Sequence, residues 1–315
     1  MSCNLDWMAA FGAMRRTRRV DGSNAEAQRA STLLTLRIVG ELWRRGAGAR
    51  VLGVGLALAA AAIVTASCGG GDDGSDGGAL RVVATTPIIA SLVEEVGGEA
   101  VRTTTLMKPG VDPHEFEPSP GDLREIAAAK LIMRHGIGLD DWLDGAIKSA
   151  GSSVTSVTVT DGITVRTVGG QRDPHVWHDP ANAVAMVDNI ERALAQADTS
   201  HASTFHENAE AARARLRAAD MEIRQLIDGI PTGNRKMVTD HDAFGYFIAR
   251  YGLTFVGAVI PSTTTQGESS AKQIAELEDT IRREGVKAIF SERSVDPKVA
   301  RQVAADTGAK VVDTL

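Results

Sequence analysis

Three of the seven histidines in this chain of 315 residues stand where a predicted strand gives way to a loop or a helix. His114 lies in GVDPHEFEPSPGD, His175 in RDPHVWHDP and His241 in TDHDAFGYF. Open α/β sheets bind ligands beyond the carboxyl ends of their strands. Imidazole suits Zn²⁺, or Mn²⁺ when a carboxylate joins it. These three side chains are therefore our candidates for a divalent-metal site.

Acidic side chains beside these histidines could orient the rings by accepting the N–H that faces away from a metal. They are Asp112, Glu115, Asp173 and Asp242. Solvation of a loop or capping of a helix explains each of them equally well. The sequence leaves both interpretations open.

The remaining four histidines have weaker contexts. His178 lies three residues after His175 and could chelate a metal with it, but we expect a solvated loop position. His135 is expected at the end of a strand, and His201 and His206 at the exposed start of a long helix. We assign no role to the last three.

Strand-like and helical segments alternate from residue 80 onward, which is typical of mostly parallel sheets covered by helices on both faces. The expected strands are 81–86, 101–107, 131–136, 154–159, 236–240, 253–260, 286–292 and 309–315. The expected helices are 87–98, 121–130, 140–150, 181–197, 204–228, 243–252, 271–285 and 297–308.

The helix at 204–228 stands out because it contains neither Pro nor Gly and stops at Gly229–Pro231. We therefore predict an α/β protein with two doubly wound lobes joined by one long rigid helix. The N-terminal lobe is expected at residues 80–198, the connecting helix within 199–230, and the C-terminal lobe at 231–315.

The N-terminal segment has the pattern of a targeting signal. Residues 51–67 form an almost unbroken apolar run that follows Arg44, Arg45 and Arg50 and leads through small residues into Cys68. This pattern is typical of a secretory signal, and small residues before a cysteine resemble a lipobox. We predict a signal peptide that ends before a lipidated Cys68. An uncleaved membrane anchor is the alternative.

Two flanking segments follow from this interpretation. Residues 68–79 consist of the cysteine and GGGDDGSDGGA, which favours a flexible tether. A signal peptide does not need residues 1–40, so within the predicted extension 1–67 we expect a start codon placed too far upstream.

Charge and cysteine content exclude several classes of protein. Outside residues 1–67 the chain has 25 basic and 36 acidic side chains, a net charge of −11. Nucleic acid is not an expected partner, because phosphate binding needs a basic face. Cys3 and Cys68 are the two cysteines, which excludes a disulfide framework and a cysteine-rich zinc site.

Four segments together resemble a known family. They are GVDPHEFEPSPGDLREI, DPHVWHDPANAVAMVDNI, TDHDAFGYFIARYGL and GESSAKQIAELEDTIRREGVKAIFSE. In this order they look like the signature segments of the TroA-like (cluster A-I) substrate-binding lipoproteins of zinc and manganese ABC transporters. The resemblance covers residues 80–315. It implies two lobes on a rigid helix, with the metal in the cleft between them.

The resemblance also implies site residues. It places the family's histidine ligands on His114, His175 and His241. Glu292 matches a family glutamate at a strand end facing the cleft, where it could support a ligand, bind the metal itself or be merely structural. The family's carboxylate ligand follows the last strand, but this sequence stops at VVDTL and Asp313 lies too early. We therefore expect a truncated C-terminus.

The implied function is capture of a metal ion outside the membrane and its delivery to an ABC permease with its ATPase. A histidine at position 241 favours Zn²⁺. The lack of a His/Asp-rich loop between Ser119 and Asp173 keeps Mn²⁺ open. We expect an extracytoplasmic monomer, held at the membrane by its lipid, with no catalytic activity.

Two rival functions remain at this level. Three histidines with an open fourth position would also describe a zinc-dependent hydrolase or lyase. The histidines are 61 and 66 residues apart, however, and no short His-Glu-x-x-His spacing is present. A surface adhesin lipoprotein is the second alternative, and it rests on surface exposure alone.

Overall fold

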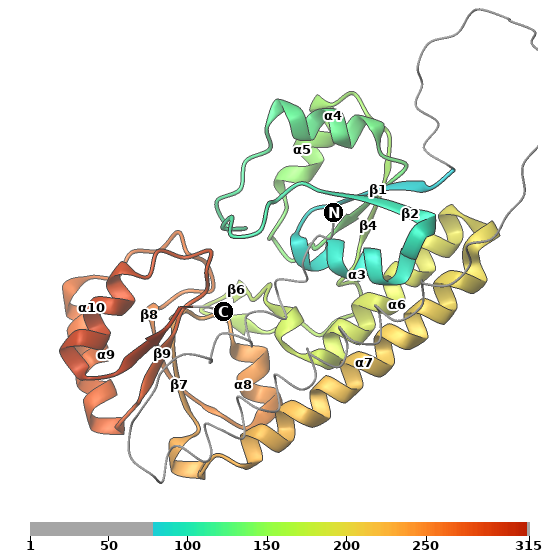
Figure 1. Ribbon diagram of the computed structural model, residues 1–315. Coiled ribbons are helices and arrows are strands. Elements are labelled where there is room, and N and C mark those ends of the chain that lie inside the picture. The colour runs from blue at the N-terminus through green and yellow to red at the C-terminus, as the bar shows by residue number, and fades with distance from the viewer. Residues whose placement is uncertain (1–77, 314–315) are drawn as a thin grey trace, which may run out of the picture.

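The computed structural model describes residues 78–313. The predicted segment 1–67, Cys68 and most of the tether 68–79 lie outside the described residues. Two four-stranded parallel sheets form two lobes that lie along a pair of long helices (Figure 1). Among the helices within residues 78–313, none combines the length and the apolar character needed to cross a membrane.

The N-terminal lobe is the sheet of order β2-β1-β3-β4 with its helices. Its strands are β1 (Leu80–Ala84), β2 (Val101–Thr105), β3 (Leu131–Arg134) and β4 (Thr155–Thr158). Alternation along β1 buries Val82 and Ala84 against α3 (Pro87–Gly97) and sends Val83 to the opposite face. There it meets α4 (Pro120–Ala128) and α5 (Trp142–Ser149). Both faces of the sheet are thus covered.

The C-terminal lobe repeats this architecture with the order β10-β9-β7-β8. Its strands are β7 (Lys236–His241), β8 (Thr254–Ile260), β9 (Ala288–Phe290) and β10 (Lys310–Val312). Val238 of β7 packs toward α9 (Ala271–Glu284) and α10 (Lys298–Thr307). Its neighbour Met237 packs on the other face with α8 (Gly245–Tyr251).

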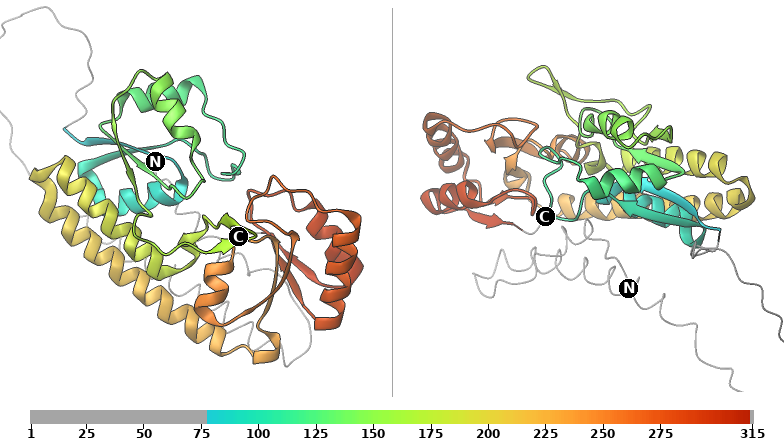
Figure 2. Two further views of the ribbon diagram at one scale, coloured as in Figure 1. Left: turned by 180° about the vertical axis from the view of Figure 1, so that it is seen from behind. Right: turned by 90° about the horizontal axis from the view of Figure 1, so that it is seen from above.

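The helix α7 (Ala202–Asp228) belongs to the cores of both lobes. Phe205, Ala209, Ala212 and Leu216 are buried with α3 and α6 (Pro180–Ala197). Further along α7, Ile223 and Ile227 pack against Phe247 of α8 and its neighbours. At 1.5 Å per residue these 27 residues span about 40 Å. Figure 2 shows α7 running past both lobes.

Shorter elements complete the connections. A two-stranded antiparallel hairpin, β5 (Thr167–Val168) and β6 (Gln171–Arg172), lies between β4 and α6. Four 3₁₀ turns are η1 (Gly98–Ala100), η2 (Val176–His178), η3 (Thr199–His201) and η4 (Thr232–Asn234). Of these, the hairpin and η2 matter most for the site.

The predicted fold class is confirmed, since two doubly wound α/β lobes share one long helix. That helix begins at Ala202 and not at Thr204, because η3 leads directly into it. The hairpin β5–β6 was not predicted from the sequence. Its strands have two residues each and are too short to show a periodic pattern.

Candidate metal site

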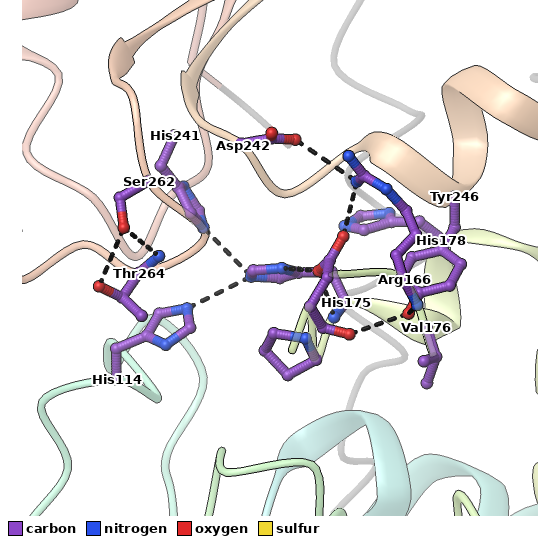
Figure 3. A network of polar contacts seen from close by, with 12 residues as sticks. His114, Arg166, His175, Val176, His178, His241, Asp242, Tyr246, Ser262 and Thr264 are labelled. Atoms are coloured by element: carbon purple, nitrogen blue, oxygen red, sulfur yellow. Dashed lines mark hydrogen bonds and ion pairs between the residues drawn. The ribbon is translucent and has the colours of Figure 1, made fainter. Parts of the chain in front are cut away.

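The three candidate histidines come from three different parts of the fold. His114 lies in the loop between β2 and α4, and His175 lies between β6 and η2. His241 is the last residue of β7 in the C-terminal lobe. Side chains from both lobes therefore meet at one place (Figure 3).

The Nε2 atoms of these rings face one another. His175 Nε2 lies 3.3 Å from His114 Nε2 and 3.2 Å from His241 Nε2. A tetrahedral ion with Zn–N bonds of about 2.0–2.1 Å separates its nitrogen ligands by about 3.3–3.4 Å. Two of the three pairs thus already have the spacing of ligands around one small cation, and the ligand atoms of all three histidines lie within 4.8 Å of one another.

Two buried carboxylates set the orientation of two rings. Asp173 Oδ1 accepts from His175 Nδ1 at 2.8 Å, and Asp240 Oδ1 accepts from His241 Nδ1 at 2.9 Å. Because a carboxylate accepts only, each Nδ1 carries the hydrogen and each Nε2 presents its lone pair. Two lone pairs that face each other at 3.2 Å repel each other unless a positive charge lies between them.

Asp240 is the functional residue that sequence reasoning missed. It is buried, and its second oxygen, Oδ2, accepts from Glu292 N at 2.7 Å and from Ser291 Oγ at 3.2 Å. It therefore ties His241 of β7 to the segment after β9. The available signal was an acidic residue directly before a histidine at a strand end.

The four acidic residues named from the sequence have different contacts in the structure. Asp173 does orient His175, as described above. Asp112 accepts from the backbone N–H of His114 at 2.9 Å and so shapes the loop, and Asp242 lies 3.5 Å from Arg166. Glu115 is exposed.

The protonation of the rings follows from burial and from neighbouring charges. Burial, and then the neighbouring His241, lowers the pKa of His114 to about 4. Burial also holds the pKa of His175 well below its usual value. Burial lowers the pKa of His241 as well, but the bond to Asp240 and the charge of Glu292 outweigh it, so that pKa is raised. His114 and His175 are thus neutral at neutral pH, as a metal requires.

Glu292 lies beside His241 but not among the Nε2 atoms. Its Oε2 is 3.5 Å from His241 Nδ1, and its Oε1 is 3.9 Å from His178 Nε2. Burial raises the pKa of this carboxyl to about 7. The position favours support of His241 over direct coordination.

The expectation that His178 is a solvated loop residue is wrong. Only 15% of its side chain is exposed, and its ring stacks on Phe244 with centroids 4.4 Å apart. Phe244 comes from the C-terminal lobe and covers the η2 turn, which explains the burial. Within residues 78–313, His178 Nε2 is buried and has no hydrogen-bond partner. Its ring centroid lies 6.5 Å from that of His175.

The other histidines lie as expected. His135 directly follows β3 and donates from Nε2 to the carbonyl oxygen of Pro174 at 2.7 Å, which anchors the segment carrying His175. His201 and His206 are exposed near the start of α7, paired with Asp198 and Glu191.

Replacing Asp240 by asparagine is expected to weaken metal binding about tenfold. Asparagine keeps the shape of the side chain but removes the charge that strengthens His241 as a ligand. The measurement is competition with a chelator of known affinity. Asp161→Asn in the exposed turn after β4 is the matched control, and equal affinities of the two variants would contradict the role assigned to Asp240.

Comparison with known proteins shows the family of this chain. The family model described as zinc-uptake complex component A, periplasmic, matches residues 82–315. The chain is 34% identical over 236 residues to the manganese-binding lipoprotein MntA of Bacillus subtilis, covering 73% of this chain and 76% of that protein. It is 31% identical over 235 residues to the iron-binding protein YfeA of Yersinia pestis, covering 73% and 75%.

A solved structure shows the same fold. The periplasmic zinc binding protein TroA from Treponema pallidum superimposes with a TM-score of 0.70 at 27% sequence identity. The match covers 75% of this chain and 89% of that chain. The similarity therefore spans both lobes and the helix between them.

Proposed function

This chain belongs to the zinc-uptake complex component A family, and from that premise we propose that it is the substrate-binding protein of a metal ABC importer. Its cargo is a divalent metal ion, Zn²⁺ or Mn²⁺. Family membership favours this function over the zinc-dependent hydrolase and the adhesin. We propose that the protein itself catalyses no reaction.

The observation that carries the proposal is the convergence of three Nε2 atoms from both lobes. His114, His175 and His241 hold the ion in this proposal. Asp173 and Asp240 fix two of the rings, and Glu292 acts on His241 and not on the ion. The fourth ligand is not assigned.

The donor set favours Zn²⁺ over Mn²⁺. Three neutral imidazoles suit a four-coordinate zinc ion, whereas Mn²⁺ prefers a larger share of oxygen ligands. The names of relatives include zinc, manganese and iron binding proteins, so family membership alone does not determine which metal is bound. We propose Zn²⁺ as the preferred cargo and Mn²⁺ as the weaker one.

The remaining parts of the proposal concern delivery. The loaded protein docks as a monomer on a membrane permease that a separate ATPase drives. Lipid on Cys68 holds it on the outer side of the cell membrane, with residues 68–79 as the tether. The functional units are 80–198, 199–230 and 231–315. Because α7 is packed into both lobes, ion entry and release involve small rearrangements around the cleft.

The test is a metal titration of the purified, metal-stripped chain. We expect one Zn²⁺ per chain, with Zn²⁺ bound more tightly than Mn²⁺. At a free Zn²⁺ concentration of 100 times Kd, the free energy of unfolding should rise by about 2.7 kcal/mol. Absence of stoichiometric binding by any divalent ion would contradict the transport function. Zinc-dependent hydrolysis that His175→Ala abolishes would favour the hydrolase.

A further inference from the structure

Arg166 lies in the segment between β4 and the hairpin β5–β6, outside every motif discussed so far. Its Nη1 donates to Asp173 Oδ2 at 2.6 Å and lies 3.5 Å from Asp242 Oδ1 (Figure 3). Asp173 precedes His175, whereas Asp242 follows His241 in the C-terminal lobe. One guanidinium thus lies between two carboxylates that belong to the two halves of the site.

The carboxylate of Asp173 is shared between two partners. Oδ1 accepts from the ring and the backbone of His175, at 2.8 and 3.0 Å, and Oδ2 accepts from Arg166. Asp173 is fully buried, so its negative charge needs a nearby cation. Arg166 supplies that cation and fixes the rotation of the carboxylate at the same time.

Backbone contacts hold Arg166 in this place. Its N–H donates to the hydroxyl oxygen of Tyr246 at 2.9 Å, and that hydroxyl donates to the carbonyl oxygen of Asp173 at 2.9 Å. The N–H of Asp173 in turn donates to the carbonyl oxygen of Arg166 at 3.0 Å. Tyr246 belongs to α8, so these bonds also join the segment carrying His175 to the C-terminal lobe.

Gly245 makes room for the guanidinium. A Cβ at this position would lie 1.1 Å from Arg166 Nη1 and 1.9 Å from Arg166 Cζ. The guanidinium therefore fills the space that any other residue at position 245 would occupy. The obstructing atoms are the end of a flexible side chain, so Gly245→Ala can displace them without disrupting the helix.

We propose that Arg166 is a positioning residue of the metal site. It holds the Asp173 carboxylate in the orientation that contacts His175, and it connects both residues to the C-terminal lobe. The ligands from the two lobes therefore keep a fixed geometry. This inference rests on the proposed metal-binding function. Arg166 does not contact the ion in this proposal and acts through Asp173.

The sign of the effect separates this role from simple electrostatics. Removing a positive charge near a bound cation strengthens cation binding by Coulomb's law. Loss of the contacts that orient Asp173 weakens cation binding instead. The loss is typically about 10–100-fold when a residue that supports a ligating histidine is changed. A weaker site after loss of a nearby cation is therefore specific to the positioning role.

The experiment compares Zn²⁺ affinity, by chelator competition, for the full chain, four test variants and one control variant. Arg166→Met removes the guanidinium, and Gly245→Ala displaces it without changing the charge. Asp173→Asn removes the carboxylate, and the fourth variant combines Arg166→Met with Asp173→Asn. Arg172→Met in the adjacent hairpin is the matched control, because it removes an exposed positive charge from β6.

We expect each single change at 166, 173 or 245 to weaken binding about tenfold or more. The double variant should bind as weakly as the weaker single variant, because both changes break one unit. Arg172→Met should bind as tightly as the wild type or slightly more tightly. Thermal unfolding of each metal-free variant verifies that it is folded at the assay temperature.

The outcomes are distinguishable. If the wild type binds no metal, the proposed function fails. If the wild type binds and both Arg166→Met and Gly245→Ala bind equally well, the inference about Arg166 fails alone. The inference would also be overturned if the fold-losses of affinity caused by Arg166→Met and Asp173→Asn multiplied in the double variant, because the two residues would then act independently.

Discussion

Replacing His175 by alanine is expected to weaken Zn²⁺ binding by a factor of about 10²–10³. Its Nε2 is the central atom of the site, 3.3 Å from His114 Nε2 and 3.2 Å from His241 Nε2. Structural Zn²⁺ sites of four ligands are worth about 10–16 kcal/mol, hence about 2.5–4 kcal/mol per ligand. Each 1.4 kcal/mol corresponds to a factor of ten in affinity.

The measurement is chelator competition at pH 7.5, combined with the metal content of the purified protein. His206→Ala is the matched control, since 62% of that side chain is exposed and it lies on α7 far along the chain from the ligands. The site assignment would be wrong if His175→Ala and His206→Ala bound Zn²⁺ equally tightly. An alanine at 175 also removes one of the two partners of the Asp173 carboxylate, so unfolding of the variant must be measured alongside.

The metal-free protein is expected to lose stability as the pH falls below about 6.5, the ordinary pKa of histidine. Burial lowers the pKa of His178 to about 3 and also lowers that of His135. Between pH 6.5 and these lower values the unfolded chain binds protons that the folded protein does not. From pH 7 to pH 5, His178 alone should cost about 2 kcal/mol of the free energy of unfolding.

The variant His178→Leu tests this prediction. It should lose about 2 kcal/mol less stability than the wild type between pH 7 and pH 5, measured by urea unfolding without metal. At pH 7 it should be at least as stable as the wild type, because His178 Nε2 is buried without a hydrogen-bond partner in the described residues. His206→Leu, an exposed position, is the control. Parallel pH profiles of His178→Leu and wild type would contradict the assignment.

Much of the fold followed from the sequence because its signals are local. The β-branched run in β1 and the uninterrupted helical pattern of α7 depend on neighbouring residues only. The convergence of His114, His175 and His241 could be anticipated because His241 ends a strand and the other two lie in loops that follow strands.

The parts that escaped prediction depend on contacts between distant segments. His178 is buried because Phe244, 66 residues later, covers it. The role of Arg166 depends on its contacts with Asp173 and Asp242 and on the space left by Gly245. No rule of sequence spacing connects these positions. Asp240 looked like an ordinary strand residue, although its oxygens join β7 to the segment after β9.

The shared helix α7 also has a consequence for folding. Phe205 and Leu216 complete one hydrophobic core, and Ile227 completes the other. Neither lobe can unfold alone without exposing part of this apolar surface to water, which is unfavourable. The two lobes should therefore behave as one cooperative unit, and an ion bound by a few atoms at their junction should slow the unfolding of both.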